Sequence, residues 1–324
     1  MKRVFPDAEI TLLTSAGLGS VLSNNPHIDH LILHKRKESL SELKILIKFL
    51  RTKKFDLVYD AHRSIRSIWI VWNLTYLGLR KTPIVWSINK RTWQRSLLIN
   101  FKVNLLSNTL PQRKHLLLPL QDHSNLLLND ETELFPGPIA TLQINNFLKK
   151  NRLMHKKYIA IGASASYPLK RWPLLYFKEL ISILIKQDFP VLLVGGANEQ
   201  ENTKLEHYFS GSVTNASGKF TSLESAELLR HAKIVLTNDT SISHIAEAMQ
   251  TPAIVIFGAT VKEFGYTPFL NESTIVETNE KLNCRPCSSD GRGRCSNKEN
   301  LRCLTSVTPD MVLPIIPKIN DHNG

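Results

Sequence analysis

Short apolar runs alternate with longer segments of helical periodicity along the second half of the chain. The runs at 158–162, 191–194, 234–236 and 253–257 have the length and composition of buried strands. Between the first two, Phe177–Ile185 places its apolar residues on one helical face. Strands and helices that alternate in this way predict a parallel sheet covered by helices, so the fold class is α/β and this half is a doubly wound, Rossmann-like unit.

The first half repeats this alternation less regularly. We predict strands at 9–14, 31–33 and 55–59. Ser39 and Glu42 match a capping box, which marks the start of a helix between the last two of these strands. The first half is therefore also predicted to be an α/β unit.

The length of 324 residues is enough for two domains, each with its own packed core. Pro and Gly residues gather between 119 and 138, and a short polar helix follows them. We therefore place the domain boundary near residue 152, which gives domains 1–152 and 153–324.

A formal net charge of +13 implies acidic partners: nucleic acid, anionic lipid or phosphorylated substrates. The basic residues are scattered and no nucleic-acid-binding motif is present, so we expect no nucleic-acid partner. The opening residues MKRVFPDAE have no apolar run and so no secretory signal. These features predict a cytoplasmic protein, peripheral on an anionic membrane surface. Residues 86–114 mix aromatic and basic side chains, which suits a membrane interface and equally a helix that buries its rings in the core.

In the stretch 234–249, a predicted strand is followed by a polar turn and then by the start of a predicted helix. Asn238, Asp239 and Thr240 are residues that favour turns and caps. The free amides at a helix N-terminus, with the positive end of the helix dipole, form an anion site at the carboxyl end of a strand. The alternative is an ordinary capped helix with His244 on its surface.

Several short motifs follow one another around this stretch: KRWP at 170–173, GG followed by Glu199, GK with SLE at 218–224, NDTSISHIAEA at 238–248 and P..IFG at 252–258. In this order they resemble glycosyltransferase family 9, the heptosyltransferases of lipopolysaccharide core synthesis. The resemblance implies the GT-B fold, with two Rossmann-like domains facing a cleft.

The same resemblance implies an inverting glycosyltransferase that moves heptose from ADP-heptose to a lipopolysaccharide core or lipid A precursor, without a metal or other cofactor for catalysis. Two other functions stay open. The chain is an inactive or binding-only relative, or it is a sugar-nucleotide epimerase of similar fold, which needs no acceptor.

The resemblance also assigns donor-binding residues in the second half. It implies that Lys170 contacts the diphosphate, that Glu199 holds the ribose, and that Ser166 stands where the family often has a phosphate-binding Thr. A lysine binds phosphate as a point charge. The alternatives are a solvated lysine and a glutamate favoured by the dipole of the helix that follows.

The central motif supplies the other donor-binding residues. The amides from Thr240 onward suit a phosphate, and Asp239 suits an anchor for the loop or for a sugar hydroxyl. Ser241 replaces the Gly that the family usually has, which puts the fit or identity of the donor in question. His244 matches a family His, with packing beneath the loop as its alternative role.

In the first half, Asp60, His62 and Arg66 follow a strand, where the family binds its acceptor. Asp60 or His62 could act as a base by residue type, and Arg66 as an acceptor contact; a cap on the next helix is the alternative for Asp60. The family's proposed base lies in a strand, Gly-Asp loop and helix that would precede Met1. We therefore expect an upstream extension of about thirty residues, roughly one strand–loop–helix unit.

All four cysteines fall near the end of the chain, at Cys284, Cys287, Cys295 and Cys303. In a cytosolic protein such a group favours a metal site over disulfides, and neighbouring arginines would stabilise thiolates. The spacing of the second pair departs from that of zinc ribbons. The sequence therefore predicts either structural zinc or four reduced, unligated thiols.

Overall fold

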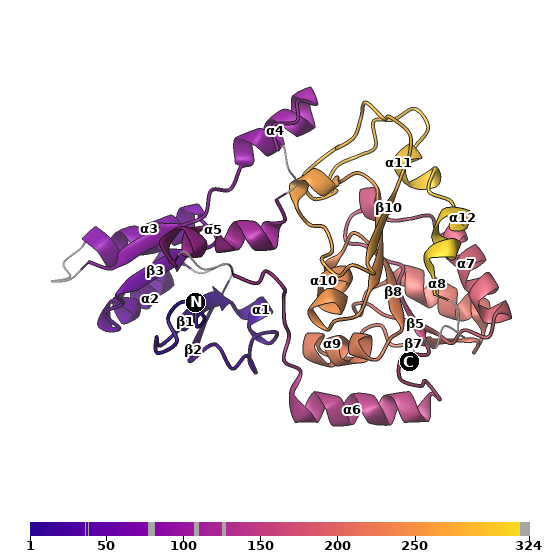
Figure 1. The fold of residues 1–324 in the computed structure, drawn as a ribbon, viewed down its shortest axis with the longest axis horizontal. Helices are drawn as coiled ribbons and strands as arrows, with labels where there is room; N and C mark the ends of the chain where they lie inside the picture. Colours follow the sequence, from indigo (N-terminus) through magenta and orange to yellow (C-terminus); the bar gives the residue numbers. More distant parts are fainter. Residues whose placement is uncertain (36, 38, 77–81, 107–109, 125–127, 318–324) are drawn as a thin grey trace. The chain divides into compact units, whose positions relative to one another are not determined.

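A computed structural model of the chain describes residues 1–35, 37, 39–76, 82–106, 110–124 and 128–317. Strands and helices alternate through these residues (Figure 1). The strands are β1 (Thr11–Ser15), β2 (His30–His34), β3 (Leu57–Asp60), β4 (Ile84–Ser87), β5 (Ile159–Gly162), β6 (Val191–Leu193), β7 (Val213–Asn215), β8 (Ile234–Asn238), β9 (Ala253–Phe257) and β10 (Thr274–Glu277).

The helices are α1 (Ala16–Gly19), α2 (Leu40–Thr52), α3 (Ile65–Tyr76), α4 (Thr92–Phe101), α5 (Gln112–Ser124), α6 (Gly137–Lys150), α7 (Leu174–Lys186), α8 (Gln200–Phe209), α9 (Ser222–Arg230), α10 (Ser241–Ala248), α11 (Arg302–Thr305) and α12 (Pro309–Val312). Three short 3-10 helices are η1 (Pro168–Lys170), η2 (Lys262–Phe264) and η3 (Leu313–Ile315).

The chain forms two compact units, and their division differs from the boundary predicted at residue 152. Unit 1 contains Met1–Thr92 and Leu110–Asp130, and unit 2 contains Trp93–Thr109 and Glu131–Gly324. The prediction failed because α6 buries its apolar face against the second sheet, where Ile144 lies in one core with Val235 and Leu228. Leu98 and Leu106 likewise pack with Phe264, which assigns α4 to unit 2.

Unit 2 is built on a six-stranded, wholly parallel sheet in the order β10-β9-β8-β5-β6-β7. The chain leaves β5 toward β6 and β7, and then returns to β8 on the other side of β5 and continues outward. The sheet therefore has its topological switch point between β5 and β8, at whose carboxyl ends ligands bind in folds of this kind.

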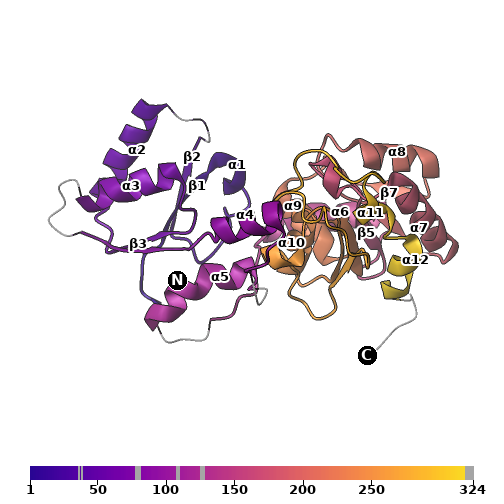
Figure 2. The same ribbon diagram turned by 90° about the horizontal axis from the view of Figure 1, so that it is seen from above.

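Helices cover both faces of this sheet (Figures 1 and 2). On one face, α7, α8, α11 and α12 pack on a core that includes Phe177, Leu180 and Ile161. On the other, α6, α9 and α10 pack on a core that includes Tyr158 and Ala246. Because both faces are covered, every residue of β5, β8 and β9 is buried, which explains the continuous apolar runs in the sequence.

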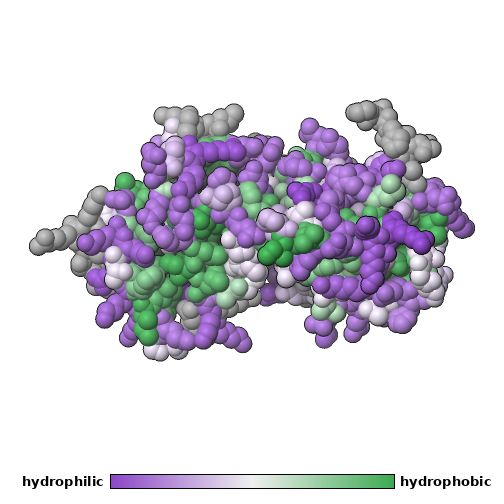
Figure 3. Space-filling view, turned by 90° about the horizontal axis from the view of Figure 1, so that it is seen from below, coloured by the Kyte–Doolittle hydropathy of each residue, from purple (hydrophilic) through white to green (hydrophobic). Residues whose placement is uncertain are grey.

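Unit 1 differs, because the four strands in its described residues form two separate parallel pairs, β1 with β2 and β3 with β4. No residue of β1 is fully buried, and Ile84 on β4 is 61% exposed. Figure 3 shows apolar side chains gathered on one face of this unit. A parallel strand is stable when both faces and both edges are covered, so this unit is less well enclosed than unit 2.

The predicted strands and the predicted capping box at Ser39 are confirmed, and a second capping box occurs at Thr221. Ser39 accepts from the Glu42 N–H at the start of α2, and Thr221 accepts from the Glu224 N–H at the start of α9. The sequence analysis missed β4, β7 and β10, which are three or four residues long and too short to show a period of their own. Within the described residues, no helix has the length and apolarity needed to cross a membrane.

The aromatic residues of segment 86–114 have different environments. Trp86 is buried on β4 and stacks on His123 at 4.3 Å between ring centroids. Trp93 and Phe101 on α4 are 59% and 71% exposed. The alternative in which this segment buries its rings in the core is therefore wrong for α4.

Candidate functional site

The loops that follow β5 and β8 meet at the switch point of the unit 2 sheet. The loop after β5 leads into η1, which ends at Lys170. The loop after β8 contains Asp239 and ends at Thr240, the N-cap of α10. The two central strands of the sheet therefore place a lysine and a helix N-terminus at one edge, as an anion site requires.

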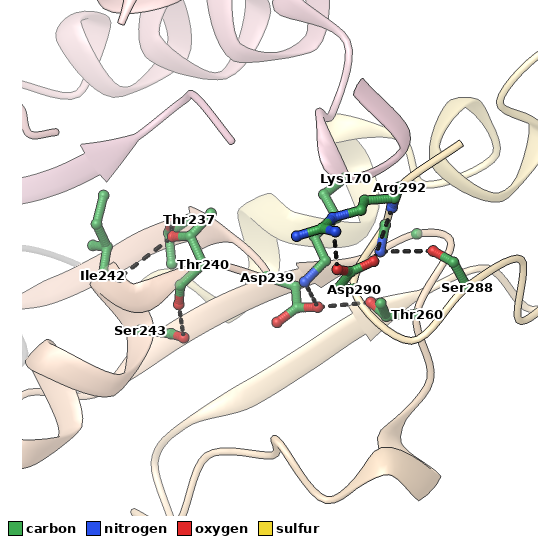
Figure 4. A network of polar contacts seen from close by, with 12 residues as sticks. Lys170, Thr237, Asp239, Thr240, Ile242, Ser243, Thr260, Ser288, Asp290 and Arg292 are labelled. Atoms are coloured by element: carbon green, nitrogen blue, oxygen red, sulfur yellow. Dashed lines mark hydrogen bonds and ion pairs between the residues drawn. The ribbon is translucent and has the colours of Figure 1, made fainter. Parts of the chain in front are cut away.

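Lys170 and Asp239 form the central ion pair of this edge (Figure 4). Lys170 Nζ lies 2.7 Å from Asp239 Oδ2, and their side chains are 16% and 9% exposed. The Thr260 hydroxyl also donates to Asp239 Oδ2 at 2.7 Å. Asp239 thus anchors both the lysine and the loop after β9, while two of the three N–H donors of Lys170 stay available to a ligand.

Asn238 joins the two loops, a role that the sequence analysis missed. Its side chain is fully buried, accepts the Trp172 N–H at 2.9 Å and donates to the Ala163 and Ser164 carbonyl oxygens at 3.0 and 3.2 Å. It therefore fixes the KRWP segment over the ends of both strands. From sequence, Asn238 was only a turn residue, because its partners lie about seventy residues away in the chain.

The start of α10 is capped locally. The Thr240 hydroxyl accepts from the Ile242 N–H at 3.3 Å, and the Ser243 hydroxyl donates to the Thr240 carbonyl. Ser241 and His244 are exposed. Because His244 is exposed, its alternative role of packing beneath the loop is wrong; its ring centre lies 6.4 Å from that of Tyr266. Ser166 is also exposed, in the loop after β5.

Glu199 lies in the loop after β6, the strand that pairs with β5 on the side away from β8. It is the N-cap residue of α8. Its carboxylate packs against Gly195, and a Cβ atom added to Gly195 would lie 1.8 Å from Glu199 Oε2. Asn202 donates to that oxygen at 3.3 Å. Burial raises the pKa of the Glu199 carboxyl above its ordinary value of 4.5, with a further contribution from the nearby Glu201 carboxylate.

The predicted acceptor-side residues belong to unit 1. Asp60 is buried and accepts from the His62 N–H at 3.0 Å, the Arg63 N–H at 2.7 Å and the Ser67 hydroxyl at 2.9 Å. It therefore holds the turn before α3, whereas the helix cap that was its alternative role is made by Ser64, whose hydroxyl accepts from the Ser67 N–H at 3.2 Å. His62 is exposed, and Arg66 donates to the Lys35 carbonyl at 3.2 Å.

The four cysteines occupy one region of unit 2. Burial raises the pKa of the Cys303 thiol to about 11, and the other three thiols are close enough to influence it. Cys295 Sγ accepts from the Leu301 N–H at 3.2 Å, and Asn297 donates to Cys284 Sγ at 3.5 Å. Across the described ranges, no three His, Cys, Asp or Glu side chains are arranged to hold a metal ion, so the thiols are gathered but do not converge on one point.

Comparisons with known proteins identify the family of the chain. The sequence matches the family model of glycosyltransferase family 9 (heptosyltransferase) over residues 44–294. It is 28% identical to lipopolysaccharide heptosyltransferase 3 of Escherichia coli over 273 residues, 80% of this chain and 77% of the relative. It is 26% identical to lipopolysaccharide heptosyltransferase 2 of Escherichia coli (strain K12) over 299 residues, 84% and 80% of the two chains.

The fold is similar to solved structures of the same kind. The glycosyl transferase family 9 protein from Veillonella parvula DSM 2008 superposes with a TM-score of 0.78 at 18% identity, over 97% of this chain and 89% of that one. E. coli ADP-heptose lps heptosyltransferase II superposes with a TM-score of 0.70 at 20% identity, over 97% and 90%. These likenesses confirm the GT-B fold, and the family match spans most of the chain. The chain belongs to glycosyltransferase family 9 (heptosyltransferase) and is a glycosyltransferase of lipopolysaccharide biosynthesis.

Proposed function

We propose that this protein transfers heptose from ADP-heptose to a lipopolysaccharide core or lipid A precursor, with inversion at the anomeric carbon. The observation that carries the donor half of the proposal is the Lys170–Asp239 pair beside the α10 N-terminus at the switch point. The solved E. coli heptosyltransferase WaaC contains ADP-2-deoxy-2-fluoro heptose, which supports the same donor class here.

The donor site of the proposal uses residues of unit 2. Lys170 and the amides at the start of α10 bind the diphosphate, because their positive charge and partial charges attract its negative charge. Glu199 accepts hydroxyls of the ribose. Ser166 and Ser241, both exposed at the ends of these loops, offer further hydroxyl donors. His244 borders the same helix start.

The proposed reaction is a single displacement. The acceptor hydroxyl oxygen attacks the anomeric carbon, the bond from that carbon to the diphosphate oxygen breaks, and ADP leaves with the electron pair. A base takes the proton of the acceptor hydroxyl. Within the described part of unit 1, His62 suits this role better than Asp60, because three hydrogen bonds already engage the Asp60 carboxylate. Arg66 suits an acceptor phosphate.

Helix α4 supports an amphiphilic acceptor at an anionic membrane surface. Arg95 donates to the Phe264 carbonyl and Lys102 to the Pro286 carbonyl, so the cations hold α4 to unit 2. Trp93 and Phe101 are left exposed. Exposed rings on a basic helix suit the apolar–polar boundary of a lipid. A cytoplasmic location, peripheral on the inner membrane, follows as part of this proposal.

The test is a transfer assay with purified protein, ADP-heptose and heptose-deficient lipopolysaccharide. We expect ADP release that depends on the acceptor, a mass gain of one heptose, and the opposite anomeric configuration in the product by NMR. Binding of ADP-heptose without turnover would favour a binding-only relative. Conversion of the sugar nucleotide without acceptor would favour an epimerase.

The raised pKa of Glu199 predicts a pH dependence of donor binding. As the pH falls, the Glu199 carboxylate becomes protonated at a pH above 4.5, the ordinary pKa of a glutamate. The protonated carboxyl group no longer accepts hydrogen bonds from two hydroxyls of the ribose. Affinity for ADP-heptose should therefore be full near neutral pH and decline before an ordinary glutamate would titrate. Calorimetry across this range checks it. Glu199→Gln should bind more weakly and lack this decline, and a wild-type decline that persists in Glu199→Gln would contradict the assignment.

Structural zinc stays a prediction, because the thiols as arranged do not form a metal site. If zinc binds, the four thiols must move to about 2.3 Å from a shared metal. Metal analysis of the purified protein should then find about one zinc ion per chain, and Cys284→Ser should lower it. Four reactive thiols in a native protein without bound metal would establish the alternative.

A further inference from the structure

Four cations that the structure describes around the donor site have carboxylate partners. The four pairs are Lys170 with Asp239, Arg171 with Glu201, Arg285 with Glu277 and Arg292 with Asp290. A diphosphate brings more than one negative charge, and Lys170 is already neutralised by Asp239. Beyond the amides at the start of α10, a cation that can leave its carboxylate would therefore add to the attraction for a diphosphate.

Two of these arginines are fixed by backbone carbonyl groups. Arg171 Nε donates to the Ala165 carbonyl at 2.8 Å. Arg285 donates to the Gly258 and Thr260 carbonyls at 2.7 and 2.9 Å, and its side chain is only 11% exposed. If either moved, buried carbonyl groups would lose their hydrogen bonds, which is costly. Their role is to hold the loops.

Arg292 is held differently. Its side chain is 67% exposed, and its partner Asp290, at 3.0 Å, is 43% exposed. Its other contacts are with Tyr167, whose hydroxyl accepts from Nε at 2.9 Å and whose ring centre lies 5.3 Å from the guanidinium. An ion pair this exposed contributes little free energy. Arg292 can therefore exchange Asp290 for a stronger anion at small cost.

The position of Arg292 is set by its neighbour in the chain. Gly291 lies against the stem of Lys170, where a Cβ would come within 2.7 Å of Lys170 Cγ, and its φ of +87° favours glycine. The same loop is tied to the end of β9, since the Cys287 N–H donates to the Ala259 carbonyl at 3.0 Å. Figure 4 shows Arg292 and Asp290 beside Lys170 and Asp239.

We infer that Arg292 is a second diphosphate-binding residue, which leaves Asp290 and pairs with the donor's phosphates while Tyr167 guides its guanidinium. A guanidinium suits this task because it can bind two phosphate oxygens at once. The inference rests on the proposed function, because it presumes a nucleoside diphosphate at the Lys170 site. It gives the cysteine-rich loop a part in donor recognition.

The test compares binding of ADP, AMP and adenosine, by calorimetry, to wild type, Arg292→Gln, Arg292→Lys and Arg294→Gln. Arg294 is an exposed arginine of the same loop and serves as the charge-matched control. Arg292→Gln should bind ADP at least about tenfold more weakly, as expected for the loss of a charged hydrogen bond. Its affinity for adenosine should not change, Arg292→Lys should recover part of the loss, and Arg294→Gln should stay within about twofold of wild type.

The outcomes separate the inference from the proposed function. Wild type that binds ADP, with Arg292→Gln equal to Arg294→Gln, would overturn the inference and leave the function standing. A loss of adenosine binding in Arg292→Gln, matched by a lower melting temperature, would show a structural role and also overturn it. Wild type with no affinity for ADP would overturn both.

Discussion

Lys170→Ala should weaken binding of ADP-heptose by about 2 kcal/mol, or about thirtyfold, because a charged contact to the diphosphate is lost. The loss in transfer activity at low donor concentration should be at least as large. The structure adds a second consequence. Asp239 would be left nearly buried without its cation, so unit 2 should also unfold at a lower denaturant concentration.

Two variants separate these effects. Lys170→Gln keeps a donor for Asp239 but not the charge, and it should lose donor affinity with a smaller loss of stability. Lys186→Ala, at the exposed end of α7, removes a lysine of the same unit and should change neither. Calorimetry with ADP-heptose and a denaturation curve for each variant suffice. Wild-type affinity in Lys170→Ala would remove Lys170 from the donor site.

Asn238→Ala should lower the free energy of unfolding of unit 2 by about 3 kcal/mol, because it strips a buried N–H and two carbonyl groups of their partner. The affected groups are the Trp172 N–H and the Ala163 and Ser164 carbonyls. Since these groups join the KRWP segment to the sheet, donor affinity should fall as well. Urea denaturation and calorimetry measure the two effects.

A matched control is Asn215→Ala on the edge strand β7. Asn215 is half-buried, donates to Glu206 at 2.7 Å and accepts from the Ser217 N–H at 2.9 Å. Because these bonds are only partly buried, its loss should cost about 1 kcal/mol and spare donor binding. Equal destabilisation by both substitutions would show that Asn238 has no special role at the switch point.

Much of unit 2 could be predicted from sequence, because its central strands are buried on both faces and read as continuous apolar runs. The runs at 234–236 and 253–257 predicted the strands β8 and β9 for this reason. The Lys170 and Asp239 positions were likewise predictable, since each follows such a run. What could not be predicted was that these two side chains pair with each other, because pairing depends on the strand order, which periodicity does not give.

The sequence was less informative where structure depends on distant contacts. Residues 137–150 form a helix that its position in the sequence assigned to the first half. In the structure, Ile144 of this helix packs in a core of the second sheet. Gly291 and Arg292 lie in a loop without periodicity. From sequence, only the cysteines of this loop carried a prediction, that of a zinc site or free thiols. The place of Gly291 and Arg292 beside Lys170 comes from backbone bonds that join the loop to the end of β9. No local pattern records such bonds.

The chain passes between the two units three times, at Thr92, Thr109 and Asp130. Leu98 and Leu106 on the first excursion have Phe264 as their core partner, which is synthesised about 160 residues later. During translation this apolar segment therefore stays exposed to solvent and to chaperones until the part of the chain that contains Phe264 has emerged. For the same reason, a fragment starting at Glu131 would expose Phe264, so a well-behaved donor-binding fragment would have to carry residues 93–109 as a grafted or co-expressed peptide.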